Sequence, residues 1–201
     1  FGPWQKSSTP KLTYTDPKNV DFTQINFIDM PNAVQSEISL VNTINLKMSD
    51  PDFFPAAIAT YILGGDINSY LNMNLREKHG WTYGANATIG SGKYVSKLKS
   101  ASAVRSIATD SAVVEFIKEI KKIRTEKVSD ELLANVKAGY IGRFVMQVQK
   151  PQAVARYALN IETEKLPADF YENYIKNITA VTAEQVQLAA NKYFLIDNTR
   201  I

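Results

Sequence analysis

The feature that most limits the possible folds is a change of hydrophobic period along the chain. Residues 34–44 and 81–104 alternate apolar with polar side chains, as half-buried strands do. From about residue 110 the apolar residues recur at helical spacing instead, as Val113, Phe116 and Ile120 show. Because strands come first and helices follow, this order predicts an α+β fold in which helices cover one face of an antiparallel-rich sheet.

The first half contains the predicted strands. Two strands are expected from Val20 onward, separated by a turn at Pro31-Asn32. Residues 81–89 and 93–104 flank a Gly-Ser-Gly turn and are expected to form a hairpin. Between these pairs we expect two helices, the second over about residues 67–78. The glycine pair 64–65 is expected to join the two helices with positive φ.

Residues 1–18 differ in composition from the rest of the chain. They contain three prolines, two serines and three threonines without a sustained period, which is typical of a linker or the tail of a preceding domain. Residues 19–201 are then expected to form a single α+β domain. Since the chain starts with Phe1 and its last residues resemble the start of a strand, we expect it to be part of a longer polypeptide.

Several classes of chemistry are excluded by residue counts. The chain has one histidine, His79, and no cysteine, so histidine- or thiolate-based zinc sites, disulfides and cysteine nucleophiles are not expected. No phosphate-binding glycine loop is present, and no cofactor is expected in this chain. The sequence around His79 predicts a solvated residue at a helix end.

Charge and hydropathy give further limits on partners. A net charge of +3 and lysines on one predicted strand face, 93, 97 and 99, indicate protection of an exposed strand rather than nucleic-acid binding. The longest apolar run without charge, residues 53–65, is too short to span a membrane. The absence of cysteine is compatible with the periplasm and with the cytoplasm.

One stretch, residues 63–83, brings distinctive residues together. Arg76 is expected in the last turn of a helix that Gly80 ends, and Tyr83 is expected three residues into the following strand. A tight turn at Gly80 would let Arg76 and Tyr83 converge on one place. On the residues alone, each also has an ordinary structural explanation.

The same stretch resembles the signature of a known family. The motif is Gly64-Gly65, Ser69-x-Leu71 and Leu75-Arg76-Glu77-Lys78-x-Gly80-x-x-Tyr83. It is similar to the C-terminal, non-metal-binding half of pitrilysin-family peptidases, which include insulinase and the mitochondrial processing peptidase. Supporting matches lie at Gln35-Ser36, at Asn198-Thr199-Arg200 and at Phe1-Gly2-Pro3-Trp4.

The resemblance implies a function that this chain performs only with a partner. In that family two homologous halves close around an extended peptide; one half binds zinc through His-x-x-Glu-His, and the other contributes an arginine and a tyrosine. Arg76 and Tyr83 occupy those positions and are the expected catalytic residues, acting on the substrate carbonyl. The chain alone is expected to be inactive, with zinc held by a homologous half in the same polypeptide or in a separate subunit.

Two other functions fit the same family resemblance. The chain could be a non-catalytic assembly or scaffold subunit, as some family members have become in respiratory complexes. It could also capture extended peptides by strand addition without cleaving them. A zinc-binding partner half would distinguish the peptidase from both alternatives.

Overall fold

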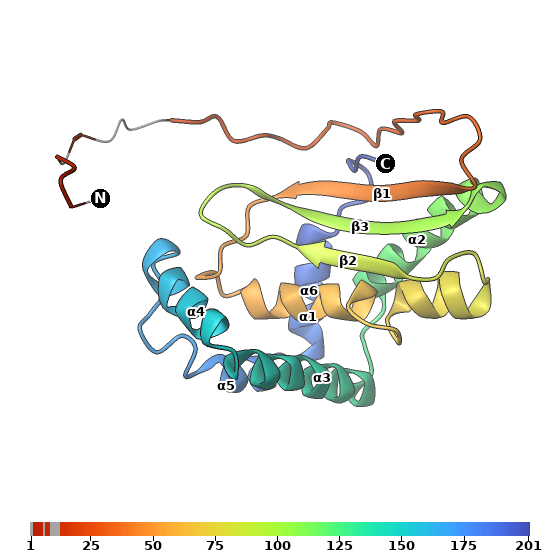
Figure 1. The fold of residues 1–201 in the computed structure, drawn as a ribbon. Helices are drawn as coiled ribbons and strands as arrows, with labels where there is room; N and C mark the ends of the chain where they lie inside the picture. The colour runs from red at the N-terminus through yellow and green to blue at the C-terminus, as the bar shows by residue number, and fades with distance from the viewer. Residues whose placement is uncertain (1, 6, 9–12) are drawn as a thin grey trace.

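The protein is described here by a computed structural model that covers residues 2–5, 7–8 and 13–201. Within these residues a three-stranded antiparallel sheet has the order β1-β3-β2 (Figure 1). The strands are β1 (Gln35–Ile44), β2 (Ala85–Ile89) and β3 (Ser96–Arg105). The predicted hairpin is confirmed, with Ala85 opposite Ser102 and Ile89 opposite Leu98.

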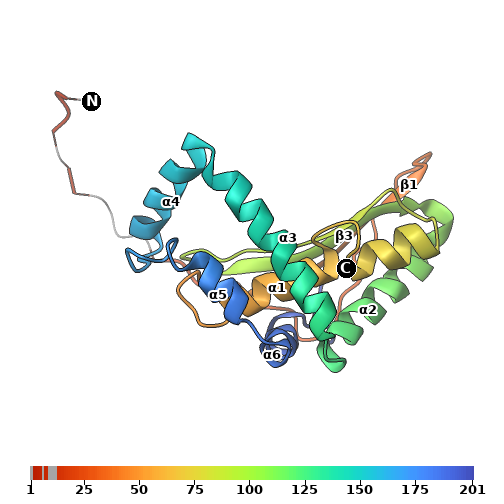
Figure 2. The same ribbon diagram turned by 90° about the horizontal axis from the view of Figure 1, so that it is seen from below.

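The helices lie on one side of this sheet, as predicted, and Figures 1 and 2 show them from the side and from below. Their bounds, in chain order, are α1 (Phe53–Gly64), the wide helix η1 (Asn72–Lys78), the short η2 (Ser106–Ala108), α2 (Thr109–Thr125), α3 (Asp130–Val148), α4 (Pro151–Thr163), α5 (Tyr174–Ala180) and α6 (Ala183–Tyr193). The predicted α+β architecture with one covered sheet face is therefore confirmed.

Helix α1 lies at the centre of the core. It packs against β2 on one side and against α3 and α6 on the other. Of its residues only Phe54 is not buried, because the helix has protein on all sides. Side chains of β1 point alternately to the two faces of the sheet, and those on the face toward the helices, which include Ile38, Leu40 and Ile44, are buried.

The prediction of a strand beginning at Val20 is wrong. The chain does turn at Pro31-Asn32, where Asn32 has φ of +71°, but residues 20–34 make only an isolated bridge, from Gln24 to Arg200. Arg200 itself pairs with Val41 of β1, with N–H···O distances of 2.8 and 3.0 Å. Residues 199–201 therefore occupy the edge of β1 that the predicted strand would have needed.

The start of the predicted domain is attached to the same edge. Asn19 exchanges two hydrogen bonds with the backbone of Thr43, at 2.7 and 2.8 Å, and Val20 is buried. Residues 13–18 are exposed and contain no helix or strand. Residues 1, 6 and 9–12 of the predicted linker lie outside the described residues, and the division at residue 18 stays a prediction.

Candidate functional site

Arg76 is carried by a helix of unusual geometry. Residues 72–78 form a π-helix, a rare conformation that is often found at functional sites. Helical structure begins at about residue 70 rather than at residue 67 as predicted, because Asp66 and Ser69 form a turn before it. The helix ends at Lys78, and Gly80 then turns the chain with a φ of +61°, which glycine adopts without strain.

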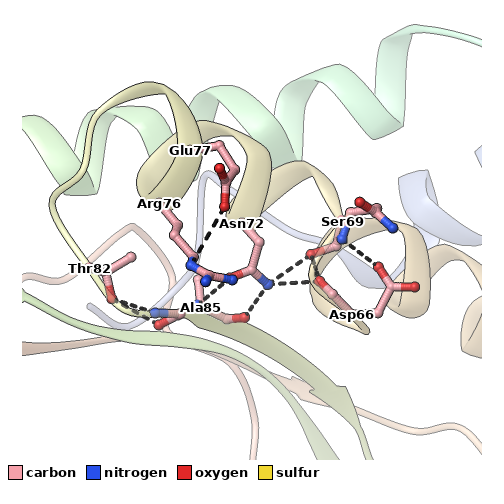
Figure 3. Close-up of polar contacts among 9 residues, drawn as sticks. Asp66, Ser69, Asn72, Arg76, Glu77, Thr82 and Ala85 are labelled. Carbon is pink, nitrogen blue, oxygen red and sulfur yellow. Dashed lines mark hydrogen bonds and ion pairs between the residues drawn. The ribbon is translucent and has the colours of Figure 1, made fainter.

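Arg76 keeps much of its hydrogen-bonding capacity available. Its side chain is 39% exposed, and its Nε lies 3.6 Å from Glu77 Oε1 (Figure 3). In the described part of the chain this ion pair is the one charged contact of Arg76. A guanidinium has five N–H donors, so several remain free to bind an anionic or carbonyl oxygen.

Tyr83 lies in the loop before β2 and not within a strand, so that part of the prediction is wrong. The strand begins only at Ala85, because side-chain hydrogen bonds replace the ladder before it. Thr82 Oγ1 lies 3.0 Å from the N–H of Gly84 and 2.9 Å from its carbonyl oxygen. Ser102 Oγ of β3 lies 2.9 Å from both Thr82 Oγ1 and the Gly84 carbonyl oxygen.

The backbone on both sides of Tyr83 is thus anchored to β3, while its side chain is 92% exposed. A phenol so exposed contributes little to packing. No hydrogen bond or ring contact joins Tyr83 to Arg76 in the described residues, and the convergence of the two side chains on one substrate atom stays a prediction.

Asn72 connects the helix of Arg76 to the loop of Tyr83, and the sequence reasoning missed it. Its Oδ1 accepts a hydrogen bond from the N–H of Ala85 at 2.8 Å, and its Nδ2 donates to the carbonyl oxygen of Ala85 at 2.8 Å (Figure 3). Nδ2 also lies 2.8 Å from the Asp66 carbonyl oxygen and 3.1 Å from Ser69 Oγ. One feature of the sequence could have pointed to Asn72: asparagine is a poor helix former, yet this one follows Leu71 inside a predicted helix.

Gly64 and Gly65 have a different role from the predicted one. Among the described glycines only Gly80 has positive φ. A Cβ at Gly64 would lie 2.4 Å from the backbone nitrogen of Ala87, so glycine lets the end of α1 approach β2 closely. At Gly65 a Cβ would lie 2.5 Å from the ring of Tyr61.

The end of η1 is also fixed to its neighbours. His79 stacks on Trp81 with ring centroids 4.0 Å apart, and its Nε2 is buried without a hydrogen-bond partner. His79 lies at the helix end as predicted, but it is half-buried rather than fully solvated, because the Trp81 ring stacks on it. Asn74 donates to Glu115 at 2.5 Å and to buried Glu119; the bond to Asn74 holds the pKa of the Glu115 carboxyl below its usual range.

The residues that the structure describes do not fit a zinc site. The chain has one histidine and no cysteine, and within the described ranges no three His, Cys, Asp or Glu side chains are grouped so as to hold a metal ion. In the same part of the chain no helix has the length and apolar character needed to cross a membrane.

Comparisons with known proteins identify the family and the fold of this chain. A family model described as the peptidase M16 inactive domain matches residues 1–140, more than half of the chain. A peptidase M16 inactive domain from Pseudomonas fluorescens is similar in structure, with a TM-score of 0.84 at 20% identity over 96% of this chain and 46% of that one. A protease from Helicobacter pylori gives a TM-score of 0.86 at 12% identity over 98% of this chain and 47% of that one.

A third structure is similar in extent to this chain. It is the inactive peptidase domain of a proposed zinc protease from Bordetella parapertussis, with a TM-score of 0.68 at 14% identity over 86% of this chain and 93% of that one. At these identities the likeness shows the fold alone. The chain spans less than half the length of the first two structures. No curated protein sequence matches it significantly.

Proposed function

The chain belongs to the peptidase M16 family as an inactive domain, and from this premise we propose that it forms the substrate-facing half of a zinc-dependent endopeptidase. The family assignment confirms the resemblance to the pitrilysin type. Since the part of the chain that the structure describes has no group of residues fitting a zinc site, the metal would be held by a homologous half. This chain would then bind and orient an extended peptide.

The observation that carries the proposal is the presentation of Tyr83. Its side chain is 92% exposed although the backbone beside it is anchored by Thr82, Gly84 and Ser102. An exposed aromatic ring on an anchored loop adds little to folding, because it buries almost no apolar surface. Such an arrangement favours a role toward a ligand.

Arg76 supplies the complementary chemistry. Hydrolysis of a peptide bond builds negative charge on the carbonyl oxygen, and donors held in place beforehand stabilise that charge. A guanidinium with free N–H groups and a phenolic O–H are both suited to this, and neither needs to transfer a proton. Arg76 and Tyr83 are therefore proposed to donate hydrogen bonds to the substrate carbonyl oxygen. These hydrogen bonds would become stronger as negative charge develops on that oxygen.

The test replaces one donor while keeping the ring. The domain is assembled with its zinc-binding half, and hydrolysis of an internally quenched fluorescent peptide is followed. We expect Tyr83→Phe to lower kcat by about a hundredfold or more, with a smaller effect on KM, because the lost hydrogen bond acts mainly in the transition state. The melting temperature should stay unchanged, since the side chain is exposed.

Tyr94→Phe is the matched control. Tyr94 is also largely exposed, but it lies in the loop between β2 and β3 and contacts Tyr14. It should leave both kcat and melting temperature unchanged. Normal turnover of Tyr83→Phe would refute the catalytic role and favour a non-catalytic scaffold or peptide-capture domain. Loss of activity with a large fall in melting temperature would instead show that Tyr83 serves folding.

A further inference from the structure

The amide side chain of Asn72 takes the place of a neighbouring strand at the start of β2. The N–H of Gly90 bonds to the Lys97 carbonyl oxygen at 2.9 Å, and Ala85 lies opposite Ser102 in the same register. In an antiparallel strand the backbone N–H and C=O groups of alternate residues point toward the partner strand. Since those of Gly90 point toward β3, those of Ala85, five residues earlier, point away from it. Asn72 satisfies both of these groups.

Few other side chains could make this contact. An amide offers one acceptor and one NH2 donor at about the spacing of a peptide group, whereas a carboxylate only accepts and a hydroxyl is too small to span both groups. Asn72 is 6% exposed, so its hydrogen bonds are shielded from water. Buried polar groups that lose their partners are costly, which makes the pairing with Ala85 well defined.

This contact joins the chain segments that carry the two proposed catalytic residues. Arg76 lies four residues after Asn72 on the same helix, and Tyr83 lies two residues before Ala85. Before Tyr83 the loop is joined to η1 by a backbone hydrogen bond from the Trp81 N–H to the Leu75 carbonyl oxygen at 3.0 Å. Its other anchors, through Ser102, attach it to β3 rather than to η1. Asn72 is therefore the side chain that ties the helix directly to the strand after Tyr83.

We propose that Asn72 is a positioning residue, which holds Arg76 and Tyr83 in the relative placement that the substrate carbonyl requires. The inference rests on the proposed function, because it concerns the same two residues. Misplacement of a catalytic group by about 1 Å can cost about a hundredfold in rate. Removing the link should thus lower turnover although Asn72 itself touches neither substrate nor reacting atoms.

The experiment uses the domain assembled with its zinc-binding half. We expect Asn72→Ala to lower kcat by about 10- to 100-fold. Because some of this could come from lost stability, the decisive measurement is a double-mutant cycle with Tyr83→Phe. If Asn72 acts by placing the phenol, Tyr83→Phe should cost less than about tenfold in the Asn72→Ala background, compared with about a hundredfold alone.

A second readout does not depend on activity. In the assembled protein the Ala85 amide should exchange its hydrogen faster in Asn72→Ala than in the wild type, because Asn72 Oδ1 is its acceptor. Asn68→Ala is the matched control: it removes the same amide group from an exposed residue of the turn before the helix, whose side chain is hydrogen-bonded to neither Asn72 nor Ala85 in the described residues. It should leave both kcat and Ala85 exchange near wild-type values.

The outcomes separate this inference from the proposed function. A Tyr83→Phe penalty that is equally large with and without Asn72 would overturn the positioning role while leaving the function of Tyr83 intact. Normal turnover of Tyr83→Phe in the wild-type background would overturn both. If Asn72→Ala does not fold, Asn72→Ser, which keeps a small polar group but cannot reach both groups of Ala85, goes through the same cycle with the same criteria.

Discussion

Replacing Gly64 by alanine should destabilise the protein, although the same change in a helix usually stabilises. An added Cβ would lie 2.4 Å from the Ala87 nitrogen, 2.8 Å from Ala87 Cβ and 2.8 Å from the Asn86 carbonyl carbon. Carbon atoms in contact normally lie about 3.5–4.0 Å apart. The obstacle is mostly the backbone of β2, which cannot rotate away as a side chain would.

The magnitude follows from two opposing effects. Overpacking a well-packed core typically costs about 1–3 kcal/mol, and the backbone obstacle places Gly64→Ala at the upper end of that range. Alanine gains about 1 kcal/mol over glycine within a helix. The net loss should be about 2 kcal/mol, which for a domain of this size lowers the melting temperature by about 4–8 °C.

Thermal and urea denaturation followed by circular dichroism measure this loss. Gly142→Ala is the matched control, because Gly142 is an exposed residue of α3 and a Cβ there would meet no atom within 4 Å. It should stabilise the protein by about 0.5–1 kcal/mol. A Gly64→Ala protein as stable as the wild type would refute the close approach of α1 and β2.

Two further predictions concern stability at other places in the fold. The Asp52 carboxylate accepts a hydrogen bond from Lys192, which holds its pKa below the usual value, so it stabilises the fold above about pH 4 and this contribution is lost as the pH falls through the lowered pKa. Asp52→Asn should therefore be less stable than the wild type at pH 7 in urea denaturation, and the difference should shrink in acid; a difference independent of pH would contradict this assignment. Thr182 accepts from the Gln185 N–H at 3.2 Å and caps α6, so Thr182→Ala should lower the free energy of unfolding by about 1 kcal/mol. Gln185→Ala, which keeps the Thr182 cap, should cost less, and equal losses from both variants would argue against the hydroxyl as the main cap.

Local features of the sequence predicted a large part of the fold. The hairpin of β2 and β3 is formed by residues close together in sequence, so a short window contains the whole signal. The position of Arg76 near a helix end before Gly80 was also visible in this way. The role of Arg76 itself came from the family resemblance.

Contacts between distant residues could not be predicted in this way. The alternation after Val20 looks like a strand, but whether it joins the sheet depends on residues 199–201, which pair with β1 from the far end of the chain. Gly64 was predicted to allow positive φ between two helices, whereas its actual role is to let Ala87 of β2 approach α1 closely. In each case the deciding atom belongs to another element, and no period or cap within the segment reports it.

The sequence by itself determined that this chain builds an α+β domain, that it lacks the ligands for zinc, and that Arg76 and Tyr83 are the residues to examine. The first two conclusions depend on residue type and short-range spacing, and the third came from the resemblance of residues 63–83 to a known family. Only the tertiary structure decided that Tyr83 lies on an anchored loop with its phenol exposed, and that Asn72 holds this loop to the helix of Arg76. The physical reason is that hydrogen bonds to the backbone of Ala85 depend on where β3 leaves its edge open, and a sheet edge exists only once the strands have paired.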